Sequence, residues 1–430
     1  MKYRVTVAEL AAGGDGVAIC THQGERRAVF VPGVLVGEDV EIEADFTTRP
    51  ARARVLDVVS PSPDRRTAPC PHTDRCGGCN WMHMTPDAQM RGHAAIVTSS
   101  LPAAFSRALV RSHPAEAAFG YRTRARMHAI CKHGKTVVGT YGRRTREPVE
   151  IDTCIIHDPI LEPVRRTLGH WLAGSRGEGE VQLSLGSIAE GRRAVIDLRF
   201  HGELAPEVFA RLERAVLSGE IAGARVFNGE VKVPATIGDP TPWIVGPDGE
   251  SLRVAPGGFS QATELGNVLL ARRAADLAIE LTPNRDATVL ELYAGAGNLT
   301  VLLARERRVV AVESDRDACA AARRNLEARG LAAKVVEADA ATYAIPSGTK
   351  LLVLDPPRTG AKDVVHALLR KPVAAVVYVS CDPKTLGRDL AILAGGGYEL
   401  RVLETFEMFP QTSHVETIAA LVRTSKSMKR

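Results

Sequence analysis

The segment TVLELYAGAGNLT, residues 288–300, decides the fold of this 430-residue chain. It reads as a short apolar strand, a turn that contains Gly295 and Gly297, and the start of a helix. Further apolar runs of strand length follow, separated by helical patterns such as 317–329; the runs are 308–312, 333–336, 350–354 and 373–380. Regular alternation of strands and helices is typical of a parallel sheet with helices on both faces. The last third of the chain is therefore predicted to be an α/β, doubly wound (Rossmann-like) domain.

Acidic residues stand at the carboxyl ends of these predicted strands. Glu313 follows the second strand, 18 residues after Gly295, and Asp339 and Asp355 follow the next two. Ligands of doubly wound folds bind at this edge, where an acid about 20 residues past the glycines commonly binds ribose hydroxyls. Thr300 stands where the dinucleotide motif would have its third glycine. An ordinary glycine turn explains the loop alone, but the row of acids favours S-adenosylmethionine (SAM) as the cofactor.

Cys381 is the candidate nucleophile. It follows the strand 373–380 at a Pro-marked turn before a predicted helix over 384–393, where the partial charge of a helix start favours a thiolate. A lone Cys is more often a small buried hydrophobic side chain. Glu416 stands just before the apolar run 418–422, and His414, two residues earlier, would share its face. Either side chain could act as a base, and a solvent-facing carboxylate is the non-catalytic alternative for Glu416.

Three of the eight cysteines lie close together, at Cys70, Cys76 and Cys79. The N-terminal segment has no apolar signal core, so we expect a cytoplasmic protein with reduced thiols, in which such crowding indicates a metal site. A fourth thiolate would complete the set, and the candidates are Cys20, Cys131, Cys154 and Cys319. Four thiolates serve either zinc or an iron–sulfur cluster, and the spacing does not choose between them.

The net charge of +5 conceals a strongly basic segment. Residues 51–150 contain 16 Lys and Arg against 7 Asp and Glu, a net charge of +9. Within it, Arg122, Arg124 and Arg126 alternate with small residues, so a strand would present all three guanidinium groups on one face, suited to phosphates of a nucleic acid. A solvated edge strand is the alternative explanation. The balance of 45% hydrophobic and 24% charged residues excludes a disordered or collagen-like chain, and no apolar run is long enough to span a membrane.

The chain divides into three predicted domains. Residues 1–60 show short alternating strands and glycine turns, including GGDG at 13–16, and are predicted to form a small all-β barrel. Residues 61–254 form a β-rich middle domain with a helix from 85 to about 111 and another over 206–217. Residues 255–430 form the doubly wound domain.

Six motifs occur in a fixed order: FSQ at 259–261, then ELYAGAGNLT, VES, DPPR, VSCDP and MFPQTSHVET. Together they resemble the RNA 5-methyluridine methyltransferase family over about residues 1–425. The N-terminal barrel resembles the TRAM domain, an OB-like module of the ribosomal members. The resemblance implies methylation of C5 of a uridine in RNA, with 23S ribosomal RNA favoured as the substrate over the transfer-RNA T-loop.

The resemblance also implies roles for individual residues. Cys381 would be the nucleophile and Glu416 the proton acceptor. The implied SAM contacts are Gln261, Tyr293, Asn298, Glu313, Asp339 and Asp355, and the implied ligands of a [4Fe–4S] cluster are Cys70, Cys76, Cys79 and Cys154. The chain departs from the family pattern at Asp382 and Thr263, where Asn is usual.

Two other functions are weaker alternatives. Methylation of an exocyclic amine through DPP would need an aromatic residue where Arg358 stands, and it would leave Cys381 without a task. A non-catalytic RNA-binding protein would leave the SAM pocket unexplained. Nothing in the sequence requires an obligate protein partner, and we expect a monomer.

Overall fold

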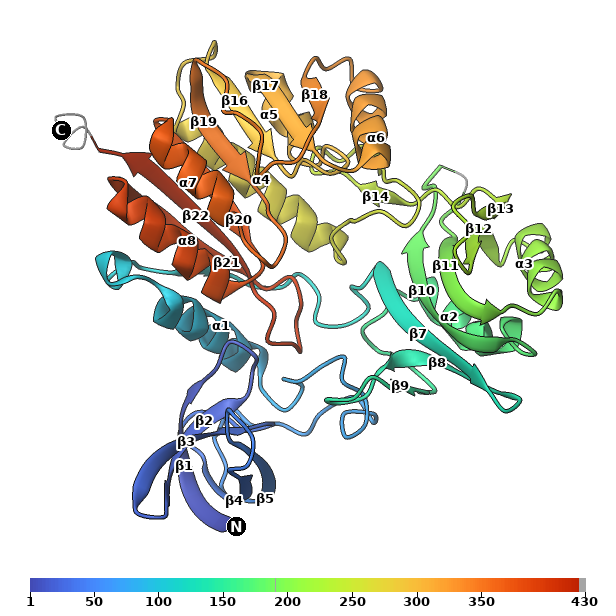
Figure 1. Ribbon diagram of the computed structural model, residues 1–430, viewed down its shortest axis with the longest axis vertical. Helices are drawn as coiled ribbons and strands as arrows, with labels where there is room; N and C mark the ends of the chain where they lie inside the picture. The colour runs from blue at the N-terminus through green and yellow to red at the C-terminus, as the bar shows by residue number, and fades with distance from the viewer. Residues whose placement is uncertain (190, 425–430) are drawn as a thin grey trace.

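The computed structural model describes residues 1–189 and 191–424. It has an N-terminal barrel, a middle sheet and a large α/β body (Figure 1). The barrel is closed in the order β1-β2-β3-β5-β4, from strands β1 (Lys2–Leu10), β2 (Gly16–His22), β3 (Glu25–Val31), β4 (Asp39–Asp45) and β5 (Arg52–Ser60). Alternate apolar residues such as Val7, Val29 and Ile42 fill its interior, so the predicted all-β barrel is confirmed.

The segment after the barrel runs to helix α1 (Pro86–Ser100). Thr85 caps this helix by accepting a hydrogen bond from the Ala88 N–H, and Pro86 occupies its first turn. The prediction of a helix to about residue 111 is wrong, because Leu101 precedes Pro102 and is extended. A short 3-10 turn η1 (Ala103–Phe105) and strand β6 (Arg111–His113) follow instead.

The middle sheet has seven strands in the order β13-β12-β11-β10-β7-β8-β9. Helices α2 (Leu161–Trp171) and α3 (Glu207–Leu217) pack on one face, where Met127, Leu183 and Phe200 are buried. Helix α3 matches the predicted helix over 206–217, whereas α2 was not predicted. The strands are β7 (Arg124–Lys132), β8 (Lys135–Tyr141), β9 (Pro148–Val149), β10 (Arg176–Leu185), β11 (Ala194–Glu203), β12 (Ile221–Asn228) and β13 (Ala235–Gly238).

The α/β body contains an eight-stranded sheet in the order β18-β17-β16-β19-β20-β22-β21-β6. Strands β16 to β20 are parallel, and β22 runs antiparallel between β20 and β21. The bounds are β16 (Thr288–Leu292), β17 (Arg308–Glu313), β18 (Lys334–Glu337), β19 (Thr349–Leu354), β20 (Ala375–Ser380), β21 (Tyr398–Phe406) and β22 (Glu416–Arg423). The predicted doubly wound sheet is therefore confirmed, and β16 is the strand predicted at the start of the segment 288–300.

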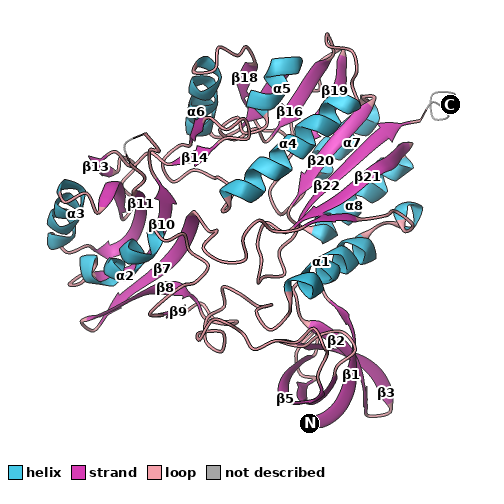
Figure 2. Cartoon of the chain, turned by 180° about the vertical axis from the view of Figure 1, so that it is seen from behind, coloured by secondary structure: helices cyan, strands magenta, loops and turns pink. Residues whose placement is uncertain are grey.

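Helices cover both faces of this sheet, as Figure 2 shows from behind. Alternate residues of one strand face opposite helix layers: Leu352 and Leu354 pack with α1, α7 and α8, whereas Leu351 and Val353 pack with α4 and α5. The bounds are α4 (Glu264–Glu280), α5 (Thr300–Glu306), α6 (Arg316–Glu327), α7 (Lys362–Arg370) and α8 (Pro383–Gly395). Such double burial explains the continuous apolar runs in the sequence.

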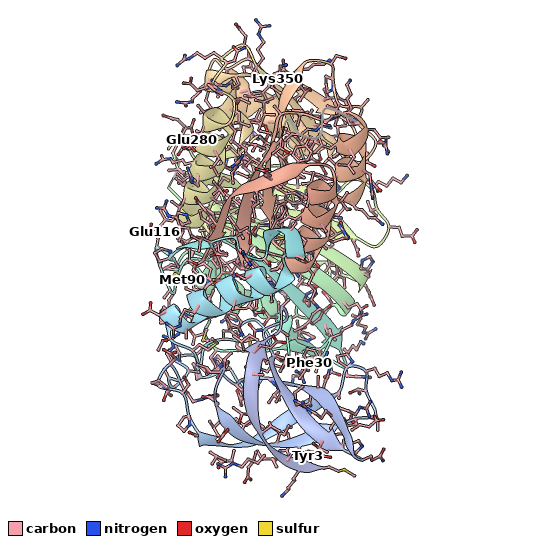
Figure 3. The ribbon with its side chains drawn as sticks, turned by 90° about the vertical axis from the view of Figure 1, so that its left-hand side faces the viewer. Tyr3, Phe30, Met90, Glu116, Glu280 and Lys350 are labelled. Carbon is pink, nitrogen blue, oxygen red and sulfur yellow. The ribbon has the colours of Figure 1, made fainter. Side chains whose placement is uncertain are left out.

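Two segments inside the predicted middle domain pack on the α/β body. Strand β6 pairs with β21, and α1 packs against α8. The hairpin of β14 (Trp243–Val245) and β15 (Ser251–Arg253) packs against α5 and α6 through Leu252. In Figure 3, α1 with Met90 lies between the barrel, with Tyr3 and Phe30, and the body with Lys350. The chain thus passes between the middle sheet and the body several times.

Candidate active site

The strand order brings Cys381 and Glu416 together. Cys381 directly follows β20, and Glu416 is the first residue of β22, which is antiparallel to β20. The register pairs Ser380 with Thr417, so the next step of the ladder sets Cys381 beside Glu416. Cross-strand neighbours of this kind have Cβ atoms about 5 Å apart. Because β22 runs against its neighbours, its start lies at the carboxyl ends of the parallel strands.

Glu416 is only 3% exposed, and its Oε2 has no hydrogen-bond partner within the part of the chain that the structure describes. Burial, and then the charge of Asp355, raise the pKa of Glu416 well above its ordinary value. A buried carboxyl with a free oxygen is suited to exchange a proton with a bound ligand. His414 is exposed in the preceding loop, whereas Glu416 is buried.

The thiol of Cys381 stands in an acidic environment. Burial, and then the carboxyl groups of Glu416 and Asp355, raise the pKa of Cys381 to about 12. Burial also raises the pKa of Asp355, to about 6. The guanidinium of Arg358 opposes these rises at both Cys381 and Glu416. Arg358 was not predicted as a site residue. Its position directly after Asp355-Pro-Pro, at the end of a strand, could have indicated it.

Both departures from the family pattern are helix N-caps. The Asp382 Oδ1 accepts from the Thr385 N–H at 2.8 Å at the start of α8. The Thr263 Oγ1 accepts from the Gly266 N–H at 3.4 Å at the start of α4. Asp, Asn and Thr all cap helices, so the two substitutions preserve the local structural role.

The carboxyl edge of the sheet has the form of a nucleoside site. The Gly295 N–H donates to Glu313 Oε2 at 2.9 Å, and the Asp315 N–H donates to Glu313 Oε1 at 2.8 Å. Gly295 and Gly297 both have positive φ, and a side-chain carbon at Gly295 would meet no atom within 4 Å. The glycine loop therefore leaves open space beside an oriented carboxylate, as the predicted ribose contact requires.

Two residues at the same edge have unusual properties: the backbone of Tyr293 is strained, and the carboxyl group of Glu291 has a raised pKa. Tyr293 has φ +64°, which is rare for a bulky residue and is commonest at functional sites. Burial raises the pKa of Glu291 to about 8, so this carboxyl group is largely protonated at neutral pH. Glu291 was not predicted as a site residue, although an acid inside an otherwise apolar strand was its signal.

The remaining predicted cofactor contacts have different surroundings. The side chain of Asn298 exchanges two hydrogen bonds with Asn267, at 2.8 and 3.0 Å. Asp339 follows β18, and its Oδ1 accepts from the Ala341 N–H at 2.9 Å. Gln261 lies just before the start of α4, next to Ala262, whose carbonyl accepts from the Thr123 N–H directly before β7.

The four cysteines predicted as cluster ligands line one cavity of about 80 Å³, together with Arg122 and His157. The other candidates lie elsewhere: Cys20 is in the barrel core, Cys131 in the middle sheet and Cys319 in α6. In the described residues, no three His, Cys, Asp or Glu side chains are grouped tightly enough for one metal ion. Four thiols around one cavity are the donor set that either a zinc ion or an iron–sulfur cluster takes.

Arg124 and Arg126 alternate with buried residues on β7, as predicted, whereas Arg122 lies before the start of the strand, and β7 is an interior strand and not an edge. Their guanidinium groups have different partners. The Arg124 Nη2 donates to Gln182 Oε1 at 2.9 Å, and Arg126 pairs with Glu180 at 3.1 Å. Arg122 lies 5.9 Å from the ring centre of Phe409 in the loop before β22. The basic face therefore begins beside the candidate site.

Comparison with known proteins agrees with this geometry. Residues 263–377 match a methyltransferase small domain, and residues 334–424 match the tRNA (uracil-5-)-methyltransferase family model. The chain is 32% identical to the 23S rRNA (uracil(1939)-C(5))-methyltransferase RlmD of Pseudomonas entomophila, over 97% of this chain and 93% of that protein. It is also 32% identical to RlmD of Salmonella typhi, over 97% of this chain and 96% of the relative.

A solved structure covers nearly the whole chain. It is the Pyrococcus abyssi tRNA (uracil-54, C5)-methyltransferase in complex with S-adenosyl-L-homocysteine, with a TM-score of 0.73 and 22% identity over 98% of this chain and 100% of that one. The fold and the strand-end site define a doubly wound methyltransferase. With curated relatives above 30% identity over nearly its full length, the chain belongs to the RNA (uracil-C5)-methyltransferase family. No helix in residues 1–189 or 191–424 is long and apolar enough to cross a membrane.

Proposed function

We propose that this protein transfers a methyl group from SAM to C5 of a uridine in 23S ribosomal RNA. The observation that carries the proposal is the pair of Cys381 and Glu416 at adjacent ends of β20 and β22. A thiol and a buried carboxyl group side by side supply the nucleophile and the base that this reaction needs. The ribosomal substrate rests on the RlmD relatives, which match almost from end to end.

The proposed reaction begins at Cys381. Uracil C5 is a poor nucleophile, so the Cys381 thiolate adds to C6 and turns C5 into an enolate carbon. Bound SAM supplies an electrophilic methyl group for that carbon. Arg358 favours the thiolate, because its positive charge lies close enough to oppose the rise of the Cys381 pKa. The target base must leave its stack to reach a pocket at this depth, so we expect a flipped uridine.

Glu416 completes the proposed cycle. Its carboxylate takes the C5 proton, the bond between C6 and the Cys381 sulfur breaks, and the C5–C6 double bond is restored. The unpartnered Oε2 of Glu416 supports this role, because a buried carboxyl oxygen without a partner in the described part of the protein is free to accept a proton from a bound ligand. Exposed His414 remains the alternative base if Glu416 does not act.

The proposed cofactor site is the carboxyl edge of β16 to β19. We assign the ribose hydroxyls to Glu313, whose carboxylate is already oriented by the glycine loop. The further proposed contacts are Gln261, Tyr293, Asn298, Asp339 and Asp355. Burial raises the pKa of Glu291 to about 8, so this carboxyl group adds little negative charge to the edge at neutral pH.

We further propose that Cys70, Cys76, Cys79 and Cys154 hold a [4Fe–4S] cluster. The supporting observation is their shared cavity, which joins residues from the segment before α1 to residues near α2. When bound, a cluster would cross-link these two segments beside Arg122. We propose that the barrel at 1–60 is a TRAM-type RNA-binding module and that the middle region 61–254 carries the cluster and the basic face. Residues 255–430 would carry the chemistry. The proposed location of the protein is the cytoplasm.

Mapping of 5-methyluridine in total RNA, with and without this gene, tests the proposed substrate. We expect the loss of one or more 5-methyluridines of 23S ribosomal RNA. A loss confined to the T-loop of transfer RNA would replace the ribosomal substrate by the alternative. Unchanged 5-methyluridine in every RNA would contradict the activity itself.

A further inference from the structure

The loop of residues 407–415 leads directly into Glu416, and we call it the base loop. Distant parts of the chain hold it in place. Gln411 in its centre is fully buried and has φ +73°, outside the range that a non-glycine residue prefers. Its N–H donates to Gln89 Oε1 at 2.7 Å, and its carbonyl accepts from the Trp81 N–H at 2.9 Å. The base loop is therefore shaped by the segment before α1 and by α1 itself.

Asn80 contacts the base loop at Ser413, near the proposed base. Its Oδ1 accepts from the Ser413 N–H at 2.9 Å, and its Nδ2 donates to Ser413 Oγ at 3.0 Å. The same Nδ2 donates to the carbonyl of Gly13 at 3.2 Å. Ser413 is buried and stands three residues before Glu416. A single amide group thus links the barrel turn at Gly13 to the end of the base loop.

Gly14 places the barrel turn directly against this link. Its φ is +86°, and a side-chain carbon there would collide with the Asn80 amide and lie 2.6 Å from Ser413 Cβ. The Trp81 Nε1 donates to the Gly14 carbonyl at 2.9 Å, which fixes the turn from the other side. The GGDG motif is therefore more than a strand connection, because only glycine allows the barrel to approach the base loop so closely.

We propose that Asn80 is a positioning residue for Glu416, through which the barrel is coupled to the catalytic base. The proposal rests on the proposed function, in which Glu416 removes the C5 proton. The two hydrogen bonds at Ser413 set where the chain enters β22 and hence where the Glu416 carboxyl stands relative to Cys381. Asn80 acts through Ser413 and not on the reacting atoms.

A misplaced base has a specific kinetic signature. Addition of Cys381 and transfer of the methyl group precede removal of the C5 proton, so a defect at Glu416 delays only the release of the RNA. The methylated RNA then stays covalently attached to Cys381. A purely structural defect would instead lower the amount of folded enzyme or weaken binding, and it would not enrich this adduct.

The test uses the full-length enzyme with SAM and a 23S ribosomal RNA fragment that carries the target uridine. For Asn80→Ala we expect kcat to fall about tenfold or more and an adduct to be visible on a denaturing gel. The KM for SAM should fall with kcat, because only a step after methyl transfer is slowed. Asn80→Asp keeps the acceptor for the Ser413 N–H and should recover part of kcat. Asn284→Ala, which removes an exposed amide far from the base loop, is the control and should behave as wild type.

Two further variants keep the proposal testable if Asn80→Ala does not fold. Ser413→Ala removes only the hydroxyl contact, and Gly14→Ala pushes the barrel turn against Asn80; both should lower kcat and enrich the adduct. A wild-type kcat in Asn80→Ala would overturn the proposal. If Asn80→Ala cannot be purified, a wild-type kcat in both of these variants would do the same. A fall in kcat without the adduct would also overturn it. Absence of 5-methyluridine with the wild-type enzyme would overturn the proposed function instead.

Discussion

The Cys381 thiol stands between two carboxyl groups and one guanidinium group, so its protonation depends on which neighbours are charged. Burial and the carboxyls of Glu416 and Asp355 favour the neutral thiol, and Arg358 favours the thiolate. In the protein without RNA the balance lies with the thiol, which protects the nucleophile from oxidation. We infer that binding of RNA and SAM must change this balance before Cys381 can react.

Alkylation of Cys381 by iodoacetamide should therefore be slow at neutral pH. With a pKa of about 12, the thiolate fraction is small at pH 7 and grows about tenfold per pH unit, so the rate should still be rising at pH 10. Mass spectrometry of the peptide that contains Cys381 separates it from the other cysteines. Glu416→Gln removes one carboxylate, lowers the pKa of the thiol and should speed labelling at fixed pH. A labelling rate that is half-maximal near about pH 8.5, as for an ordinary thiol, would contradict the assigned environment.

Substitution of the two proposed catalytic residues should have distinct results. Cys381→Ala should abolish methylation and form no covalent RNA complex, because the attacking sulfur is absent. Glu416→Gln should still attack and methylate the uridine but should release it slowly, so a covalent complex accumulates. Denaturing gels with labelled RNA distinguish the two. Normal turnover by Glu416→Gln would refute its role and make His414 the next candidate.

At the scale of elements, the site depends on the insertion of β22 between β20 and β21 and on the N-termini of α4 and α8. The apolar runs predicted the parallel strands well because double burial makes such strands continuously hydrophobic. The pairing of Cys381 with Glu416 was not predictable from local pattern, since it needs the antiparallel insertion of β22 beside β20. Likewise, the short strand β6 is defined by its partner β21 and has little pattern of its own.

The roles of side chains were likewise predictable where local pattern sets them and not where long-range contacts set them. The cysteine spacing grouped three cysteines and left four candidates for a fourth, whereas tertiary folding brings Cys154 to the cavity that the three line. The arginine face of β7 was predicted from alternation, whereas the engagement of Arg124 by Gln182 comes from the neighbouring strand β10. Local pattern alone did not identify such long-range contacts; Cys154 and Glu416 were singled out from their alternatives only through the resemblance to the family.

The connection between the barrel and the next segment depends on one buried carboxylate. Glu38 is fully buried and accepts from the Leu35 and Ser62 N–H groups and from Arg65 at 2.6 Å. Although burial opposes ionisation of Glu38, these hydrogen bonds and the Arg65 charge lower its pKa. Its stabilising effect is thus present above the unfolded pKa of about 4.3 and is lost as pH falls below that value.

Arg65→Ala should therefore destabilise the protein by about 3 kcal/mol at pH 7, because it leaves the Glu38 carboxylate buried without its cation. Urea unfolding followed by circular dichroism would measure the effect, with Arg54→Ala, whose partner Glu43 is exposed, as the control expected to change little. The difference between wild type and Arg65→Ala should shrink as the pH is lowered toward 4. A constant difference over that range would contradict the assigned ionisation of Glu38.

At the scale of the whole molecule, three bodies meet around the base loop and the cysteine cavity. Asn80 and Trp81, which contact the base loop and the barrel turn, directly follow Cys79 in the chain. The cavity in turn joins Cys79 to Cys154 across 74 intervening residues. The proposed cluster would therefore hold the segment that connects the barrel, the middle sheet and the α/β body.

Removal of one proposed ligand should loosen this junction without unfolding the α/β body. We expect anaerobically purified wild-type protein to contain iron and sulfide with a cluster absorption band, and Cys154→Ser to lose both. Because the sheet around β16 and β19 has its own core, Cys154→Ser should still bind SAM in calorimetry. Its thermal unfolding should begin at a lower temperature, and its affinity for RNA should fall. Cys131→Ser, at a buried cysteine of the middle sheet outside the cavity, is the matched control and should keep its iron. Stoichiometric zinc without iron in the wild-type protein would contradict the cluster, and equal iron in wild type and Cys154→Ser would exclude Cys154 as its fourth ligand.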